Sequence, residues 1–563
     1  MAEDFMTAAV KRVEAQFEKS GVSESCAAFE RKENQIEMRD GVKLHTIYYF
    51  PKEDTAEEKT YPVILTRTCY PGNDRIHRAY GEGLARRGYV YVYQYCRGRE
   101  NSEGKWEPNI NERKDGIDTM NYLVEQPWCE ILGYWGHSYT SMTGWAFADA
   151  AEGKVAAMFL EDYGTDRFTS AYEKGCFRHD ILTAWSMENA EKPVNADYRE
   201  SCRYLPQIEV DEALWGQKVP SYREYITSPN PDAALWQTGW WKQLREIPSK
   251  TKVPIYLLSG WYDHHHGSSM KTWERLNEET KQHSWLEIGA WNHFFQICLE
   301  DKEVQHPQNE EIPKMLEWFE LTLKQKEIPT QRIRAYEIGA DRWMDTVSDG
   351  LGEKGTAGSM TLYLDEKTLR TDTPEQEKTR NYTFDPATPV ESIGGEALLH
   401  TMPQIGSHLQ PEPDYREDVL RFVSEPLEET FTLNGKASVR LFVESDCEDT
   451  AFTAKIMEVT PEGKAYNIRS SIATLEQGKT EAGAYEPGSV AEVQITMWNI
   501  VYTISKGSRI RVDVSSSDFP QYHVHSNQKG LWSEKTENKI AHQTIHMGGV
   551  HASCVILPLM KKQ

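Results

Sequence analysis

The residues with the clearest chemical potential surround Ser138. An apolar segment, residues 132–135, leads into Gly136-His137-Ser138-Tyr139, and small helix-compatible residues follow. This order predicts a strand, a sharp turn and a helix, with the serine at the turn as a nucleophile. Such a turn needs a small residue two positions before the serine, because neighbouring backbone comes close there, and Gly136 meets that need. Thr140 stands where the motif Gly-x-Ser-x-Gly has its second glycine, so the motif is imperfect.

Two residues further along the chain could activate this serine. A serine hydroxyl attacks a carbonyl group efficiently only when an imidazole takes its proton and a carboxylate orients that imidazole. Asp263 and His293 each follow an apolar segment, residues 253–259 and 284–288, by a few positions. The order Ser, Asp, His, each after a strand, is that of α/β-hydrolases. We therefore predict Ser138 as nucleophile, His293 as base and Asp263 as the acid.

Ester or amide cleavage also needs hydrogen-bond donors for the oxyanion of the tetrahedral intermediate. The main-chain N–H of Tyr139, directly after the serine, is one candidate. The loop after the apolar segment 61–66 should supply the other, and it has no glycine-rich run. The Tyr70 hydroxyl is the available donor in that loop, with simple packing of its ring as the alternative.

Three consecutive histidines, His264 to His266, follow Asp263 and could be mistaken for a metal site. Consecutive side chains point in different directions, and no cysteine or carboxylate cluster with ligand spacing lies nearby. We therefore predict no metal and no other cofactor, and a place for His264 at the rim of the pocket. His137 lies on the wrong side of the turn to act as the base of Ser138.

The pattern of elements predicts an α/β fold class with four regions. Residues 1–34 form a helical extension, residues 35–164 and 251–330 alternate buried strands with helices, and residues 331–563 consist of short alternating strands typical of a β-sandwich. Residues 165–250 interrupt the sheet pattern and carry several tryptophans, so they are predicted to form a helical cap over the carboxyl edge of the sheet. Trp185 could line a substrate pocket there, while packing of the cap is the alternative for any single tryptophan.

Composition narrows the class of partner. The formal net charge of −24 opposes binding to nucleic acid or to an anionic membrane. The nine cysteines are odd in number and contain no CxxC pair, which argues against a disulfide framework. The chain begins without a basic and apolar leader, and no apolar run is long enough to span a bilayer. We expect a cytoplasmic protein with no membrane partner, and the sequence leaves open whether it forms a homo-oligomer.

The chain resembles the group of serine hydrolases that includes cocaine esterase, the X-prolyl dipeptidyl-peptidases, the α-amino-acid ester hydrolases and the glutaryl acylases. The segments that carry the resemblance are residues 38–44, 66–71, 97–104, 126–128, 136–139, 260–263, 289–293, 446–455 and 515–520. The resemblance implies an α/β-hydrolase body, a helical cap and a C-terminal jelly roll of the galactose-binding-like type. It also implies the triad Ser138, Asp263 and His293, with Tyr70 and Tyr139 forming the oxyanion hole. Ser141 departs from the family, which usually has glycine at that position.

The function expected from this resemblance is hydrolysis of a carboxylic ester, with a small-molecule ester or a short peptide as substrate. Alternatives within the family are an X-Pro dipeptidyl-peptidase, an α-amino-acid ester hydrolase or an amide acylase. Glu161, Asp162 and Asp166 are the acidic residues that could bind a substrate ammonium group, against the alternative of capping a helix. A different class of function, an inactive binding or scaffold protein, is opposed by the complete set Ser138, Asp263 and His293.

Overall fold

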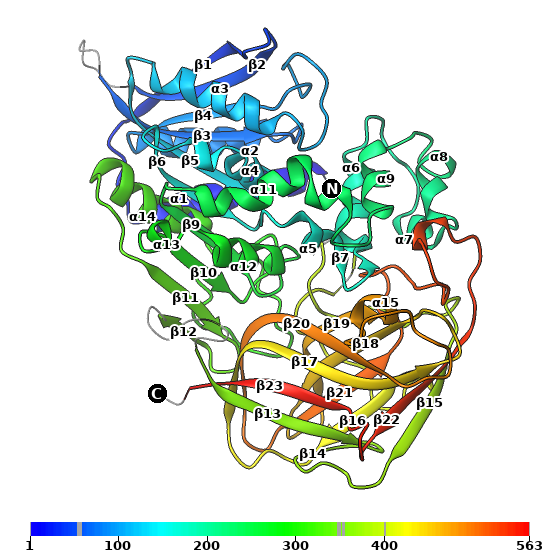
Figure 1. Ribbon diagram of the computed structural model, residues 1–563. Helices are drawn as coiled ribbons and strands as arrows, with labels where there is room; N and C mark the ends of the chain where they lie inside the picture. The colour runs from blue at the N-terminus through cyan, green and yellow to red at the C-terminus, as the bar shows by residue number, and fades with distance from the viewer. Residues whose placement is uncertain are drawn as a thin grey trace.

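A ten-stranded sheet forms the first half of the protein (Figure 1). The computed structural model describes residues 2–52, 59–345, 351, 355–398, 401–402 and 404–561. From β4 to β11 the neighbouring strands run parallel, and the edge strands β1, β2 and β12 are antiparallel. Across the sheet the strands are β1 (Ala28–Glu37), β2 (Lys43–Lys52), β4 (Val90–Tyr95), β3 (Tyr61–Thr68), β5 (Cys129–His137), β6 (Val155–Glu161), β9 (Ile255–Gly260), β10 (Trp285–Gly289), β11 (Arg332–Glu337) and β12 (Arg342–Asp345).

The central strands are buried on both faces because helices cover both sides of the sheet. Alternate residues of β4 divide between two apolar clusters, with Val90 and Val92 in one and Tyr91 and Tyr93 in the other. Helices α1 (Ala2–Lys19), α2 (Asp74–Arg86) and α14 (Glu311–Phe319) contribute to the tyrosine side. The opposite side is covered by α3 (Glu112–Val124), α4 (Tyr139–Trp145) and α12 (His266–Arg275). Shorter helical segments are η1 (Ala148–Ala150), α13 (Glu278–Lys281) and the π-turn η4 (Glu320–Lys324).

The cap lies between β6 and β9 in sequence and is largely helical, as predicted. Its tryptophans Trp215, Trp236 and Trp241 are buried together with Tyr222 and Tyr225, so most of them pack the cap itself. The cap contains α5 (Arg167–Ala171), β7 (Tyr172–Glu173), β8 (Cys176–Phe177), the π-turn η2 (His179–Thr183), α6 (Ala184–Glu188), α7 (Tyr198–Arg203), η3 (Gln207–Glu209), α8 (Val210–Ala213), α9 (Pro220–Ile226), α10 (Ala234–Gln237) and α11 (Gly239–Lys250).

The C-terminal region is an all-β sandwich, as predicted (Figure 1). Its pairings are antiparallel apart from β14 with β16, and the alternating burial along β17 and β20 is typical of strands with one buried face. Its elements are β13 (Thr356–Asp365), β14 (Thr368–Arg370), β15 (Lys378–Phe384), β16 (Leu420–Ser424), β17 (Phe431–Ser445), β18 (Ala451–Val459), β19 (Ala465–Thr474), α15 (Leu475–Gly478), β20 (Ala491–Ile504), β21 (Arg509–Ser515), η6 (Trp532–Glu534), β22 (Ala541–Met547) and β23 (Cys554–Met560).

Two region boundaries differ from those predicted. The sheet begins with β1 at Ala28, inside the segment 1–34 that we assigned to a helical extension. This strand is mostly exposed and polar, so it lacks the alternation that marks a half-buried strand. At the other end, β11 and β12 lie beyond residue 330 yet belong to the first sheet, where β11 pairs with β10 and β12 pairs with β11. An apolar strand pattern indicates that a strand forms, but it does not indicate which sheet the strand joins.

Arg178 connects the three regions. Its guanidinium forms an ion pair with Asp180 of the cap at 2.8 Å and donates hydrogen bonds to the carbonyl oxygens of His264 in the body, at 3.4 Å, and Glu396 in the sandwich, at 2.7 Å. The side chains of Arg178 and Asp180 are fully buried. Among the described residues, no helix is both long and apolar enough to cross a membrane.

Candidate active site

Ser138 occupies the sharp turn between β5 and α4. Its φ of 57° and ψ of −125° are strained for a residue with a side chain, and strain of this kind is typical of functional turns. The turn is tight enough that a Cβ atom on Gly136 would lie 2.2 Å from the carbonyl oxygen of Thr140. Glycine is therefore required two positions before the serine, as the sequence motif predicts.

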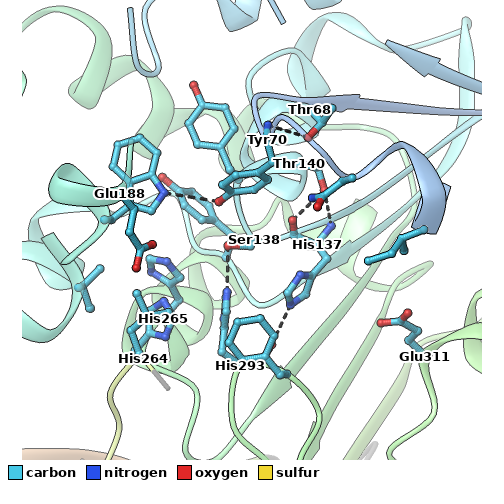
Figure 2. A pocket seen from close by; sticks show the side chains of 18 of the residues that line it. Thr68, Tyr70, His137, Ser138, Thr140, Glu188, His264, His265, His293 and Glu311 are labelled. Carbon is cyan, nitrogen blue, oxygen red and sulfur yellow. Dashed lines mark hydrogen bonds between the residues drawn. The ribbon is translucent and has the colours of Figure 1, made fainter. Parts of the chain in front are cut away.

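Asp263 and His293 reach the same place from the ends of β9 and β10. The Nε2 atom of His293 lies 2.9 Å from the Ser138 hydroxyl oxygen (Figure 2). Its Nδ1 atom lies 2.5 Å from Asp263 Oδ2. The other Asp263 oxygen accepts a hydrogen bond from the main-chain N–H of His265 at 2.7 Å. The structure thus brings the three predicted residues into one continuous hydrogen-bonded chain.

The environment of His293 favours its neutral form. Burial lowers the pKa of His293, and the neighbouring Asp263 carboxylate opposes that effect. A neutral imidazole whose Nδ1–H is held by a carboxylate leaves its Nε2 lone pair facing the serine hydroxyl. That is the protonation state in which an imidazole can accept a proton from serine.

Tyr70 follows β3 and lies beside the serine. Burial raises the pKa of its hydroxyl, although contacts with Trp185 and Ser138 oppose this. The indole N–H of Trp185 donates toward the Tyr70 oxygen at 3.5 Å. A protonated hydroxyl that accepts at its oxygen keeps its own hydrogen available for another acceptor.

Tyr139 opens helix α4, where the first N–H groups have no acceptor within the helix. Its side chain is fixed away from the serine. The Tyr139 hydroxyl donates to Glu112 Oε1 at 3.0 Å and accepts from the main-chain N–H of Asn109 at 2.8 Å. Its ring stacks on Trp185 with the centroids 5.8 Å apart. These contacts hold the first turn of α4 in place beside Ser138.

A pocket of about 350 Å³ opens above these groups. Its wall comes from all three regions, because it includes Ser138 of the body, Trp185 of the cap and Leu398 of the sandwich. Trp185 and His264, two residues predicted to contact substrate, line this pocket. His264 also lies against His293, with their ring centroids 4.1 Å apart.

Glu161 and Asp162 do not line the pocket. Both are fully buried at the end of β6, and the Glu161 carboxylate accepts a hydrogen bond from Trp135 Nε1 at 2.8 Å. Burial raises the pKa of both carboxyl groups. Their position behind the pocket wall removes the basis for their predicted contact with substrate. Asp166 caps the N-terminus of α5, because its side chain accepts a hydrogen bond from Thr169 N. This agrees with helix capping, the alternative to binding a substrate ammonium group.

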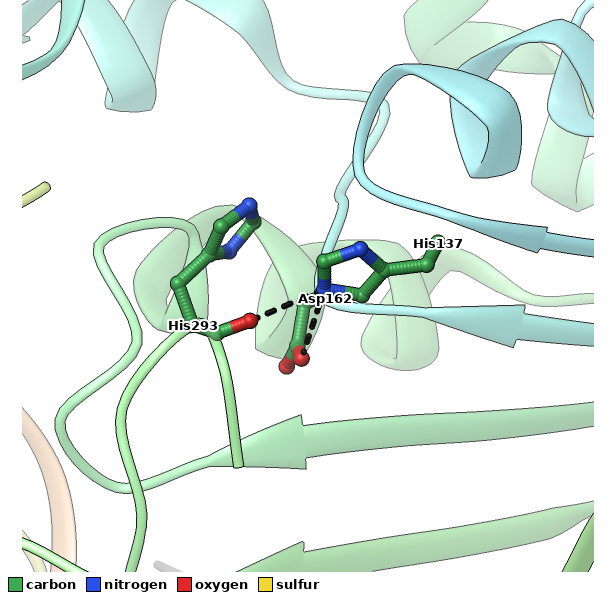
Figure 3. A group of neighbouring side chains, drawn as sticks. All are labelled: His137, Asp162 and His293. Atoms are coloured by element: carbon green, nitrogen blue, oxygen red, sulfur yellow. Dashed lines mark hydrogen bonds and ion pairs between the residues drawn. The ribbon is translucent and has the colours of Figure 1, made fainter. Parts of the chain in front are cut away.

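His137 ties the loop that carries His293 to the serine turn. Its Nε2–H donates to the main-chain carbonyl oxygen of His293 at 2.9 Å and lies 3.5 Å from Asp162 Oδ2 (Figure 3). The sequence indicates only that His137 is not the base. Its hydrogen bond joins positions that are 156 residues apart, and local spacing gives no sign of such a contact.

The three consecutive histidines point to different partners, as expected. His264 lies against His293, His265 Nδ1 meets the Ser170 hydroxyl at 3.0 Å, and His266 Nε2 meets the Asn499 carbonyl at 3.2 Å. Two groups of side chains have the atom types and spacing to hold a metal ion, namely His137, Asp162 and His293, and Asp263, His264 and His293. Both groups include His293, whose two ring nitrogens already contact Ser138 and Asp263, and we assign no metal to either.

Three charged pocket residues were missed by the sequence analysis. Arg167, Glu188 and Glu311 all line the pocket, the first two from the cap and the third from the start of α14. They follow no spacing rule, because cap loops and helix ends are brought to the pocket by tertiary packing alone. Only the abundance of charged residues in the predicted cap could have drawn attention to Arg167 and Glu188.

Two protein families match the chain by sequence. Residues 40–295 match the X-Pro dipeptidyl-peptidase (S15 family), and residues 329–556 match the X-Pro dipeptidyl-peptidase C-terminal non-catalytic domain. Cocaine esterase from Rhodococcus sp. (strain MB1 Bresler) is 27% identical over 576 residues, covering 94% of this chain and 98% of the esterase. The chain belongs to the cocaine esterase and X-Pro dipeptidyl-peptidase family of α/β-hydrolases. It is therefore an enzyme of the serine hydrolase type.

Solved structures share the fold of this family member. An aminopeptidase from a marine sediment Thaumarchaeota archaeon has a TM-score of 0.81 at 20% identity, over 96% of this chain and 97% of its own. An α-amino acid ester hydrolase has the same TM-score at 21% identity, with the same coverage of both chains. A CocE/NonD family hydrolase from Staphylococcus aureus has a TM-score of 0.66 at 16% identity, over 94% of each chain. At these identities the likeness concerns the arrangement of body, cap and sandwich.

Proposed function

We propose that this family member hydrolyses a carboxylic ester through an acyl-enzyme intermediate on Ser138. The observation that carries the proposal is the hydrogen-bonded chain from Ser138 through His293 to Asp263 at the floor of the pocket. The matching cocaine esterase supports an ester as the bond that is cleaved.

In this mechanism His293 Nε2 removes the Ser138 proton as the hydroxyl oxygen attacks the ester carbonyl carbon. Asp263 holds the imidazole in the required tautomer and stabilises the imidazolium that forms. The carbonyl oxygen becomes an oxyanion, for which the Tyr70 hydroxyl and the Tyr139 N–H are the proposed donors. The imidazolium then protonates the leaving alcohol, and a water molecule, activated by the same imidazole, releases the acid and restores the serine.

A second candidate is the cleavage of esters or X-Pro amides that carry a free ammonium group. Glu188 and Glu311 line the pocket and could attract a cation. This observation favours a substrate of the peptidase type, although neither carboxylate is as buried as the groups behind the pocket wall.

Labelling with a fluorophosphonate tests the nucleophile directly. We expect one label on the native protein, located at Ser138 by mass spectrometry, and none on the Ser138→Ala variant. Ser141→Ala is the matched control, because Ser141 is a buried serine in the same turn and helix. Labelling at another residue, or no labelling of the folded native protein, would overturn the assignment of Ser138.

A panel of substrates tests the bond that is cleaved. The panel pairs 4-nitrophenyl acetate and butyrate with aminoacyl-prolyl 4-nitroanilides. We expect ester turnover to exceed amide turnover. Cleavage of the X-Pro amides with the esters left intact would replace the first proposal by the second.

A further inference from the structure

Arg167 is a buried cation in the catalytic pocket. It is the first residue of α5, its side chain lines the pocket that contains Ser138, and the residue is only 6% exposed. The rings of Tyr225 and Trp241 lie 5.2 and 5.7 Å from its guanidinium carbon. Aromatic rings stabilise a cation, but they do not neutralise its charge.

Other buried arginines of this protein have partners that Arg167 lacks. Arg178 pairs with Asp180 at 2.8 Å, Arg511 pairs with Asp513 at 2.6 Å, and Arg469 pairs with Glu396. Among the described residues, Arg167 has no carboxylate within ion-pair distance, and its buried Nε atom has no hydrogen-bond acceptor. The adjacent Asp166 carboxylate is already engaged, because it pairs with Arg275 at 2.8 Å.

An arrangement of this kind is costly unless a ligand completes it. Removing a cation from water is costly, and a well-placed carboxylate partner offsets that cost at least in part. The tyrosines around Arg167 raise its pKa against the effect of burial, so the guanidinium stays charged. The chain has 87 acidic residues, so the lack of a carboxylate partner beside Arg167 does not follow from a shortage of acidic residues. Arg167 lines the same pocket as Ser138, the space that a substrate would occupy.

We propose that Arg167 binds an anionic group, a carboxylate, carried by the ester substrate. The inference rests on the proposed esterase function and specifies the class of substrate. A carboxylate can accept two parallel hydrogen bonds from the guanidinium fork, which gives both attraction and orientation. The carboxylate belongs either to the acyl group, as in the hemiester of a dicarboxylic acid, or to the leaving alcohol.

The other charged groups of the pocket restrict where this anion can bind. Glu188 and Glu311 would repel it, but Glu188 is exposed, Glu311 is half-buried, and water screens both. His265 lies near Arg167 and is neutral, because burial, His293 and Arg167 all lower its pKa. Arg167 is therefore the group that distinguishes a charged substrate from a neutral one.

Two matched pairs of substrates test the proposal. Mono-4-nitrophenyl glutarate is compared with its methyl ester, which places the charge on the acyl side. 4-Acetoxybenzoate is compared with its methyl ester, which places the charge on the leaving group. For one of these pairs we expect kcat/KM of the native enzyme to be at least about tenfold higher for the charged member.

Variants at Arg167 assign that preference to the guanidinium. Arg167→Met should lower kcat/KM for the preferred charged substrate by about 30-fold or more, and that for its methyl ester by less than about threefold. Arg167→Lys, which keeps the charge but not the fork, should give an intermediate loss. Arg223→Met is the control, because it removes a cap arginine that pairs with Asp211 outside the pocket.

A binding measurement keeps the proposal testable without turnover. Glutarate should raise the Tm of the Ser138→Ala enzyme, and the rise should disappear in the Ser138→Ala, Arg167→Met double variant. Equal losses on charged and neutral esters, or no preference in either pair, would overturn the role of Arg167. In those cases neutral esters would still be cleaved and Ser138 still labelled, so the proposed esterase function would stand. If the native enzyme is not labelled at Ser138, both the proposed esterase function and the role of Arg167 fail.

Discussion

Tyr70 is the residue at which the proposed chemistry can be separated most cleanly from packing. Its hydroxyl contacts Trp185 and Ser138, while its ring packs against the apolar core. Tyr70→Phe keeps the ring and removes the donor, so kcat should fall by about 10²- to 10³-fold with a smaller change in KM. Steady-state kinetics with 4-nitrophenyl butyrate measure this.

Tyr139→Phe is the matched control for that substitution. It removes a hydroxyl that bonds Glu112 but leaves the main-chain N–H proposed for the oxyanion. We expect kcat to stay within about tenfold of the native value, since loss of this buried hydrogen bond lowers the free energy of unfolding and leaves the proposed oxyanion donor in place. Equal losses in the two variants would mean that Tyr70 serves packing only.

In the proposed mechanism, His293 determines the acid limb of the pH profile. Burial lowers its pKa below the ordinary value of 6.5. The base must be neutral to act, so kcat/KM rises as pH increases through this pKa and then reaches a plateau. The midpoint of the acid limb is therefore expected below pH 6.5 for a neutral ester. A midpoint above pH 7 would contradict the proposed state of His293.

At the scale of single residues, the sequence predicts best where position along a strand decides. Asp263 and His293 could be paired with Ser138 because parallel strands end at one edge of the sheet. Arg167 could not be found in this way, since its proposed role rests on the lack of an ion-pair partner among the described residues, which only the structure reveals. The prediction that Glu161 and Asp162 contact substrate failed for a related reason. Their position next to a strand end does not indicate on which side of the pocket wall they lie.

The serine turn is the element whose geometry matters most. Gly136→Ala would place a Cβ atom 2.2 Å from the Thr140 carbonyl oxygen, so the turn must shift. We expect loss of fluorophosphonate labelling and at least about a hundredfold loss of kcat/KM, because small misplacements of reacting groups are costly. Circular dichroism and Tm measurements establish whether the variant is folded.

Ser141→Gly is the contrasting substitution in that element. It restores the glycine that the family usually has, and the buried Ser141 hydroxyl has no hydrogen-bond partner among the described residues. Activity should remain within about threefold of the native value, since no bond is lost and glycine costs only about 1 kcal/mol in a helix. A large loss would show that Ser141 supports the turn in a way that its contacts do not reveal.

Most elements of the body could be predicted because apolar runs of strand length alternate with amphipathic helices. The strands at the edges of the sheet could not be predicted in this way. β1 is polar and exposed, and β11 and β12 follow the body in sequence while resembling strands of the sandwich. Pairing across an edge is decided by long-range contacts, which the local pattern does not encode.

For the molecule as a whole, Arg178 joins cap, body and sandwich. Arg178→Met leaves the buried Asp180 carboxylate without its partner, and burial already raises the pKa of Asp180 to about 6. We expect the free energy of unfolding to fall by about 3–5 kcal/mol, measured by urea denaturation. The double variant Arg178→Met, Asp180→Asn should recover part of this loss, because it removes the unpaired charge. Equal stability of the single and double variants would contradict the role of the ion pair.

The position of the cap within the chain has a consequence for how this enzyme can acquire new substrates. Arg167, Trp185 and Glu188 come from one uninterrupted stretch between β6 and β9, whereas Ser138, Asp263 and His293 come from the body. Under the proposed function, recombination between relatives at these two strands would exchange the part of the pocket wall that the cap supplies and leave the proposed triad unchanged. Under the proposed function, a new cap therefore changes the groups that meet the substrate without changing those that carry out the reaction.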